Sequence, residues 1–177
     1  ELMEDLQTPA FAQRPKVVHL LALLDEIFET GEKALIFSSY HRSADRLAME
    51  VAVGHDDAFV AVVDGRTAHS DRMDLIARLA SHEGPGCLVL NPKAVGVGLN
   101  IVSANHVVHF DQRYNPAVTR QATARAWRRG QELPVFVHHL FYVGTVEEDA
   151  RIIQDVKQGL ADELDEGIED TVEETQS

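Results

Sequence analysis

Five short apolar runs recur along the chain, and stretches with helical periodicity separate them. The runs cover residues 34–37, 59–63, 87–90, 106–110 and 135–141. Each run is long enough for one buried strand, and the stretches between them place apolar residues three or four positions apart, as on one face of a helix. Strands that alternate with helices form βα units, in which a parallel sheet is covered on both faces. The pattern therefore predicts an α/β fold with three layers, a mostly parallel sheet with helices on both faces.

Capping residues indicate where the helices between these runs begin and end. Pro15 suits the first turn of a helix that Gly31 closes. Ser70 is expected to N-cap a later helix, and Thr145 with Glu148 has the pattern of a capping box that opens the last one. The positions expected to face the sheet are Val17, Leu20, Leu21, Leu24 and Phe28 in the first helix, Ala44, Leu47, Ala48 and Val51 in the second (residues 41–53), and Leu75, Ile76 and Leu79 in the third.

The composition is that of an ordinary folded domain with an acidic end. The 177 residues include 45% hydrophobic residues, 29 acids and 16 bases, enough for one domain with a hydrophobic core. Eight of the acids and no base lie in residues 161–177, so we expect a solvated, flexible tail, with docking on a basic surface as the alternative. No apolar run approaches the roughly 20 residues of a membrane span, and the N-terminus lacks a signal-peptide pattern.

Histidine and cysteine usage argues against a metal site or a disulfide framework. His138 and His139 are adjacent in a predicted strand, so they should face opposite ways, and His106 and His109 should diverge for the same reason. We therefore expect no metal site. Cys87 is the single cysteine and lies within an apolar run, so we expect it in the core.

One segment departs from the acidic character of the chain. Between Asp111 and Glu132 there are five arginines and no acid. These arginines are Arg113, Arg120, Arg125, Arg128 and Arg129. A solvated helix face usually mixes charges of both signs, whereas an unpaired guanidinium matches phosphate in a bidentate way. The segment is therefore predicted to meet phosphate that lies outside it, with Arg125 and Arg128 on one helix face.

Polar residues follow the ends of the predicted strands. They are Ser38, Asp64, Asn91 and Asp111, and the last run ends at Phe141. In open α/β sheets the ligand lies beyond the carboxyl ends of the strands, so the functional site is expected at this edge.

The segments at this edge resemble the C-terminal RecA-like lobe of Swi/Snf-type ATPases, which belong to superfamily two of the helicase-like motors. The segments that carry the resemblance are DGRT (64–67), AVGVGLN (94–100), HFD (109–111), YNPA (114–117) and QATARAWRRGQ (121–131). The similarity covers about residues 15–160, with residues 1–14 as an N-terminal extension and 161–177 as the tail. It implies a three-layer RecA-like domain.

The resemblance also implies roles for particular residues. Arg125 and Arg128 match two arginine fingers, which reach across a cleft to ATP held on the first lobe. Gln121, Gly98 and Asn100 match positions near the nucleotide. The positions that match nucleic-acid contacts are Ser38, Ser39, Arg66, Thr67, Lys93 and Tyr114. The implied cofactors are ATP and Mg²⁺, both held mainly by the N-terminal RecA-like lobe of the same parent chain, and the implied partner is DNA, in double-stranded form.

The sequence departs from the family pattern at four places. Asn91-Pro92 stands where the family usually has Ser or Thr, and Val95-Gly96 stands where it has two glycines. Ala124 replaces an expected Asp, and Tyr114 replaces an expected Trp. The loop at 96–100 does not fit a dinucleotide fingerprint, because the third glycine of that motif would fall at Ile101. A plain glycine turn is the remaining structural alternative.

The sequence contains no GxxxxGK[ST] phosphate loop. We therefore expect either the second lobe of an ATP-dependent double-stranded-DNA translocase or remodeller, inactive as an ATPase in isolation, or a free-standing non-catalytic module that binds a partner protein or nucleic acid. A strand-separating helicase on DNA or RNA is a third reading. The expected location is the cytoplasm, with the nucleoid, in a bacterium, or the nucleus in a eukaryote.

Overall fold

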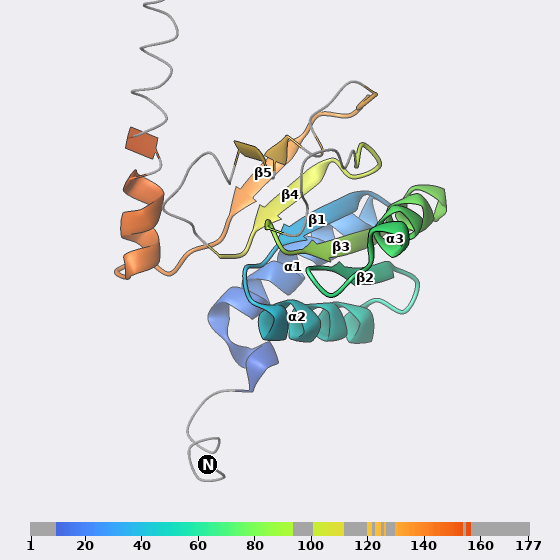
Figure 1. The fold of residues 1–177 in the computed structure, drawn as a ribbon. Helices are drawn as coiled ribbons and strands as arrows, with labels where there is room; N and C mark the ends of the chain where they lie inside the picture. Colours follow the sequence, from blue (N-terminus) through green and yellow to red (C-terminus); the bar gives the residue numbers. More distant parts are fainter. Residues whose placement is uncertain are drawn as a thin grey trace, which may run out of the picture.

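The structure is a computed structural model that describes residues 10–93, 101–111, 120–121, 123–124, 126, 130–153 and 155–156. Its strands are β1 (Lys33–Phe37), β2 (Phe59–Val63), β3 (Gly86–Leu90), β4 (His106–His109) and β5 (Phe136–His139). They form one sheet in the order β2-β3-β1-β4-β5, and every neighbouring pair is parallel. The predicted α/β fold is therefore confirmed (Figure 1).

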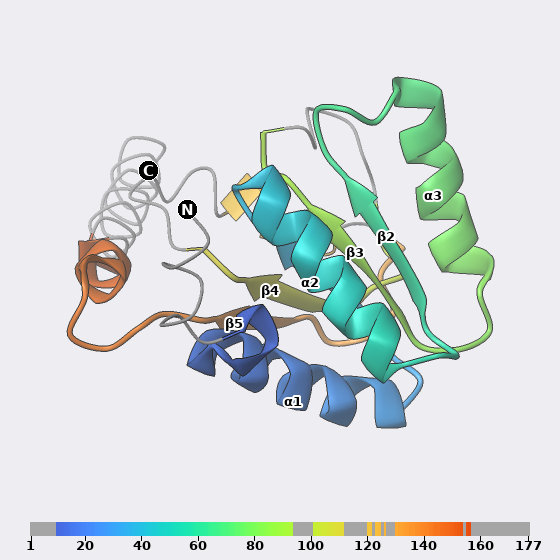
Figure 2. The same ribbon diagram turned by 90° about the horizontal axis from the view of Figure 1, so that it is seen from below.

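Helices cover both faces of this sheet. The helical elements are η1 (Phe11–Gln13), α1 (Pro15–Glu29), α2 (His41–Gly54), α3 (His69–Ser81) and a further helix over residues 146–153 and 155–156. Helices α1 and α2 pack on one face, and α3 packs on the other (Figure 2). Gly31 ends α1 with a φ of 74°, a conformation that glycine adopts without the steric cost that a side chain imposes.

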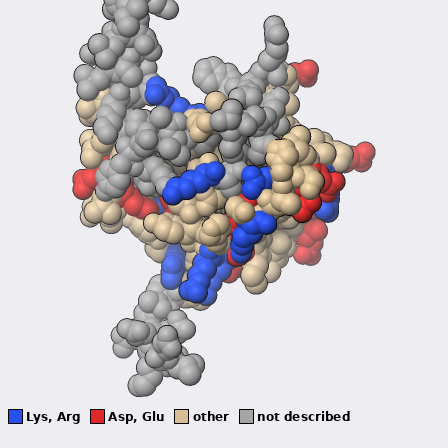
Figure 3. Space-filling view, in the orientation of Figure 1, with Lys and Arg blue, Asp and Glu red and all other residues tan. Residues whose placement is uncertain are grey.

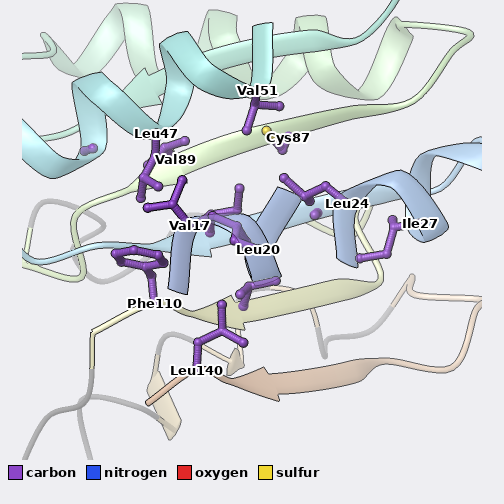
Figure 4. Packing of buried hydrophobic residues seen from close by; sticks show 14 of the residues in the cluster. Val17, Leu20, Leu24, Ile27, Leu47, Val51, Cys87, Val89, Phe110 and Leu140 are labelled. Carbon is purple, nitrogen blue, oxygen red and sulfur yellow. The ribbon is translucent and has the colours of Figure 1, made fainter. Parts of the chain in front are cut away.

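The core on the face of α1 and α2 is the larger of two apolar clusters. Leu20 and Leu24 of α1 and Leu47 of α2 are fully buried against Ile36 and Val89 of the sheet (Figure 4). Burying each leucine contributes about 1.5–3 kcal/mol relative to leaving it in water. The amphipathic pattern of these two helices is thereby explained, and Leu21 and Ala48 pack at the margin, half-buried.

Cys87 lies within the same cluster and is fully buried, as expected. Burial disfavours the charged thiolate and raises the pKa of the Cys87 thiol to about 12. The thiol is therefore neutral and inaccessible in the folded protein.

The second cluster joins α3 to the opposite face of the sheet. Ile76 and Leu79 pack with Leu35, Leu88 and Val107. The cluster also includes Ala126, which is fully buried and belongs to the arginine-rich segment. This segment is therefore attached to the same side of the sheet as α3.

Two of the predicted helix caps differ from expectation. Helix α3 begins at His69 with Ala68 as its N-cap, and Ser70 makes no cap but donates its hydroxyl to the Asp71 carboxylate. The prediction of a Ser70 cap was wrong because the helix begins before Ser70, which therefore lies within its first turn. At the last helix, Thr145 Oγ1 accepts from the Glu147 amide, where a capping box would use the Glu148 amide. The Glu148 carboxylate accepts from the Gly144 amide, where a capping box would use the Thr145 amide. Thr145 and Glu148 thus cap the helix, but each bond is shifted by one residue.

The histidines of β4 and β5 face opposite sides of the sheet, as the strand period predicted. His106 stacks with His138, with ring centroids 5.4 Å apart, and His109 stacks with His139 at 4.8 Å. Among the residues that the structure describes, no group of three or more His, Cys, Asp and Glu residues is arranged to hold a metal ion. Within the same residues, no helix has the length and apolar content needed to cross a membrane.

Replacement of Leu47 by alanine should destabilise the domain by about 2–5 kcal/mol, because it removes a fully buried side chain and leaves a cavity. Urea unfolding followed by circular dichroism would measure this loss. Met49→Ala on the same helix is the matched control, since Met49 is 67% exposed, and it should change the free energy of unfolding by less than about 0.5 kcal/mol. Equal effects of the two substitutions would contradict the packing of α2 described above.

Candidate functional site

The carboxyl ends of the central strands meet at one edge of the sheet. Backbone hydrogen bonds continue past the strands, from the Ser38 amide to Leu90 O (2.9 Å) and from the Asn91 amide to Val63 O (3.1 Å). The polar residues that follow the strands are therefore neighbours in space, as the sequence predicted. Ser38, Asp64 and Asn91 are buried at 0%, 1% and 6% exposure, so each needs partners within the protein.

The loop between β1 and α2 is held by the ends of β3 and β4. Asp111 accepts hydrogen bonds from Ser38 Oγ (3.1 Å) and the Ser39 amide (2.6 Å). The Asn91 side chain donates to Ser39 O (3.0 Å) and accepts from the Lys93 amide (3.0 Å). Ser39 is thus fixed through both its N–H and its C=O. Asn91, one of the departures from the family pattern, joins the loops that follow β1 and β3.

Asp64 at the end of β2 is the centre of a second network. Its carboxylate accepts from His41 (2.8 Å) and from the Arg66 side chain (2.6 Å) and amide (2.8 Å), and Thr67 Oγ1 accepts from the Asp64 amide. The hydrogen bonds from Arg66, with a smaller one from His41, hold the pKa of Asp64 well below its usual range despite burial. The carboxylate is therefore ionised near pH 7.

Arg66 connects this network to α2. Its guanidinium also donates to both oxygens of Asp45, at 3.0 and 2.6 Å. Its hydrogen bonds to Asp45 and Asp64 raise the pKa of Arg66 further above its ordinary value. Arg66 was predicted to contact nucleic acid, but its guanidinium is bound by two carboxylates in the structure. Even so, 57% of the side chain remains exposed.

The arginine-rich segment is attached to the body of the domain at three points. Thr123 Oγ1 lies 3.0 Å from His109 Nε2 of β4, and Ala126 is buried in the cluster under α3. Gln131 donates to Val102 O (3.1 Å) and Ala104 O (3.0 Å). Gln121 is exposed. The described residues on both sides of the arginines are thus fixed to the body of the domain.

Other predicted site residues are placed as follows. Ser38 is buried with its hydroxyl on Asp111, whereas Ser39 and Thr67 are half-buried and Lys93 is exposed. Arg125, Arg128, Gly98, Asn100 and Tyr114 lie outside the described residues, as do Val95, Trp127, Asn115-Pro116 and the tail at 161–177. Their assignments remain predictions.

His109 makes contacts at this edge that the sequence did not predict. Its ring stacks on Phe37 (5.5 Å between centroids) and on His139 (4.8 Å), and it contacts Thr123 of the arginine-rich segment. Burial, with smaller repulsion from His139 and Arg151, lowers the pKa of His109 to about 3. Burial, together with the positive charge of Arg151, lowers the pKa of His139 to about 4. Both rings are therefore neutral near pH 7. The sequence carried only the HFD motif as a signal, since Thr123 is 14 residues away.

These two pKa values predict how stability depends on pH. In the unfolded chain a histidine takes up its proton near pH 6.5, whereas in the folded protein His109 and His139 resist protonation down to about pH 3 and 4. Their contribution to stability is complete above pH 6.5 and is lost as the pH falls below it. Each should contribute a slope of up to about 1.4 kcal/mol per pH unit between pH 6 and 4.5.

The measurement is urea unfolding as a function of pH for the wild type and for His109→Gln. The variant should show a smaller slope because one of the two groups is removed. His19→Gln is the matched control, since His19 is exposed on α1. Parallel curves for the wild type and His109→Gln would mean that His109 is not held neutral.

The amino-acid sequence matches a known family of protein domains. Residues 16–130 match the model of the helicase conserved C-terminal domain. The putative ATP-dependent helicase/translocase YwqA of Bacillus subtilis (strain 168) is 36% identical over 165 residues, which are 92% of this chain and 18% of that protein. The human DNA repair and recombination protein RAD54B is 37% identical over 142 residues, which are 80% of this chain and 15% of that protein. The chain thus spans less than a fifth of the length of these relatives.

Solved structures of the same type share the fold. The C-terminal part of the Fun30 ATPase domain has a TM-score of 0.74 and 32% identity, over 85% of this chain and 49% of that chain. The Sulfolobus solfataricus SWI2/SNF2 ATPase C-terminal domain has a TM-score of 0.66 and 25% identity, over 88% of this chain and 62% of that chain. The chain therefore belongs to the helicase conserved C-terminal domain family and is a C-terminal RecA-like lobe of the Swi/Snf type.

Proposed function

We propose that this chain works as the second motor lobe of an ATP-dependent double-stranded-DNA translocase or remodeller. The observation that supports this most strongly is the attachment of the arginine-rich segment to the body of the domain. Thr123 contacts His109 of β4, Ala126 is buried in the cluster under α3, and Gln131 donates to Val102 O and Ala104 O. A guanidinium stabilises a transferring phosphoryl group only if it is held in place, because its effect depends on preorganisation. The segment has such support on both sides of its arginines.

In this proposal Arg125 and Arg128 reach ATP that is held on the N-terminal RecA-like lobe of the same parent protein. The two guanidiniums would stabilise the negative charge that develops on the γ-phosphate oxygens during hydrolysis. Gln121, Gly98 and Asn100 would lie near the nucleotide. Gln121 is exposed, as a residue that faces a second lobe must be.

The carboxylates at the described edge do not fit Mg²⁺. Both oxygens of Asp64 accept hydrogen bonds from Arg66, and His41 adds another, while Asp111 accepts from Ser38 and the Ser39 amide through Oδ2. The described edge therefore offers no pair of free carboxylates. A Mg²⁺ ion needs oxygen ligands that are free to reach it in octahedral geometry. We therefore assign the metal ion and most of the ATP affinity to the N-terminal lobe, and only cationic and backbone groups to this one.

The nucleic-acid contacts in this proposal are to the phosphate backbone, which gives affinity without sequence information. Ser39, Thr67 and Lys93 are at least partly accessible at the carboxyl edge. Arg66 would contribute through its exposed portion, whereas the Ser38 hydroxyl would act indirectly by holding Asp111 and the loop. Tyr114 completes the set on the strength of the sequence. Such a protein would act where the DNA is, in the nucleoid or the nucleus.

Arg128→Ala in the two-lobe parent should lower ATP turnover by about 10³-fold or more, the scale known for arginine fingers. ATP binding should fall far less, because the finger acts mainly in the transition state. Arg128→Lys should be nearly as damaging, since an ammonium group cannot reproduce the planar fork. Single-turnover hydrolysis and nucleotide binding would be measured on each variant.

Arg78→Ala is the matched control for Arg128→Ala. Arg78 is an exposed arginine on α3 whose guanidinium lies 5.2 Å from the Phe59 ring centroid, far along the chain from the proposed fingers. It should leave turnover unchanged. If Arg128→Ala lowered the melting temperature and the activity in proportion, Arg128 would be a structural residue and the finger assignment would be wrong.

The isolated chain should hydrolyse no ATP above background, with or without duplex DNA, because the described residues hold no free carboxylate pair for the metal ion at the carboxyl edge. A coupled phosphate-release assay would test this. Hydrolysis restored by adding the purified N-terminal lobe of the parent would support the proposal. DNA-stimulated hydrolysis by this chain alone would exclude it.

A further inference from the structure

Three arginines surround Phe11 at the start of α1 and α2. The guanidiniums of Arg14 and Arg46 each lie 5.5 Å from the centroid of the Phe11 ring, and Arg42 stands one turn before Arg46 on α2. Together they line an open hollow of about 460 Å³ with Ser43 and Asp45. Figure 3 shows basic side chains gathered over this part of the surface. We call this hollow the Phe11 arginine cluster.

The charges of this cluster are not balanced within the described residues. Asp45, the one acid that lines the hollow, is already bound by both terminal nitrogens of Arg66. No ion pair or side-chain hydrogen bond joins Arg14, Arg42 or Arg46 to a carboxylate in the part of the chain that the structure describes. Stacking on Phe11 orients the guanidiniums of Arg14 and Arg46 without neutralising them. The cluster is therefore a preformed site for an anionic partner.

The chain itself contains a segment with the complementary charge. Residues 161–177 hold eight acids and no base. Carboxylates and guanidiniums form bidentate, charge-assisted hydrogen bonds, which are stronger than those between neutral groups. The same segment places Leu164, Ile168 and Val172 four residues apart, so it also has apolar side chains that could contact Phe11.

The path of the chain brings this segment within reach. Lys16 Nζ lies 2.7 Å from Glu147, which fixes the start of the last helix beside the start of α1, two residues from Arg14. The described part of that helix, residues 146–156, is about 16 Å long at 1.5 Å per residue. The residues after 156 can span about 3.3 Å each when extended, so a return to the cluster needs only part of the segment.

We propose that the acidic segment 161–177 docks on the Phe11 arginine cluster, with its carboxylates on Arg14, Arg42 and Arg46. Docking covers the start of α2, next to Ser39 and the His41–Asp64–Arg66 network. The segment then competes with phosphate for this surface; that consequence, unlike the docking itself, rests on the proposed function. The contact is electrostatic, so it weakens with salt.

A single spin label at Thr171→Cys tests the docking in the full chain without nucleic acid. The native Cys87 is fully buried, with the pKa of its thiol raised to about 12, so the label attaches only at the new site. Paramagnetic broadening of backbone amide signals should concentrate on residues 11–14 and 42–46 at 50 mM salt. It should fall several-fold at 500 mM salt.

Two sets of variants separate docking from chance proximity. Arg42→Glu with Arg46→Glu should remove the broadening, and both side chains are exposed, so the fold should remain. Arg78→Glu is the matched control, because Arg78 also lies over an aromatic ring, Phe59, and it should leave the broadening unchanged. Neutralising Glu163, Glu166, Glu169 and Asp170 to their amides should also remove the broadening without any change in the body of the domain.

Broadening that is spread evenly over the surface, or that survives Arg42→Glu with Arg46→Glu, would overturn the proposal. A 20-base-pair duplex would then identify the competing occupant. Changes in the amide signals of residues 11–14 and 42–46 on addition of the duplex, with no broadening by the spin label when the duplex is absent, would assign the cluster to nucleic acid instead of the segment. Failure of the docking in this form leaves the ATPase tests of the parent protein unaffected.

Discussion

The parallel register of the sheet is the constraint on which the rest of the domain depends. Phe37 pairs with Leu90 on one side and with His109 on the other, and Val63 pairs with Leu90, so the strands end at nearly the same level. The residues that follow are therefore close enough to bond across strands, as Asp111 does to the Ser39 amide and Asn91 to Ser39 O. A slip of one residue in any pair would reverse the buried faces and separate these partners.

The electrostatics of this edge follow from the same bonds. Asp64, Asp111 and Asp45 all accept hydrogen bonds from groups of the domain, and the pKa of Asp64 lies well below its usual range because of Arg66. Carboxylates that accept hydrogen bonds in this way hold the loops of the edge in place. The described edge therefore presents hydrogen-bond donors more than free carboxylates, in a chain that belongs to the helicase conserved C-terminal domain family.

The strands and their order of succession could be predicted from the sequence, because run length and periodicity are local properties. The bonds that position the site could not be predicted, because their partners are distant: Asn91 is 52 residues from Ser39, and Asp111 is 72 residues from it. Motif matching identified Ser38 and Arg66 by position but could not show that the first is buried and the second is bound by two acids. The predicted Ser70 cap was wrong because α3 begins at His69, which places Ser70 inside the helix.

Two groups of arginines in this acidic chain illustrate one physical requirement. A guanidinium can bind a further anion only where the carboxylates of the folded body do not already occupy it, and the two groups differ in how they are separated from those carboxylates. Residues 112–131 contain no acid at all, and uncharged groups attach the segment to the domain, Thr123 at His109 of β4 and Gln131 at Val102 O. Around Phe11 the separation is made in space, because Arg66 occupies Asp45 and an aromatic ring orients Arg14 and Arg46. The eight acids in residues 161–177 lie apart from both groups of arginines along the sequence, so the docking proposed for this segment depends on salt and on competing anions.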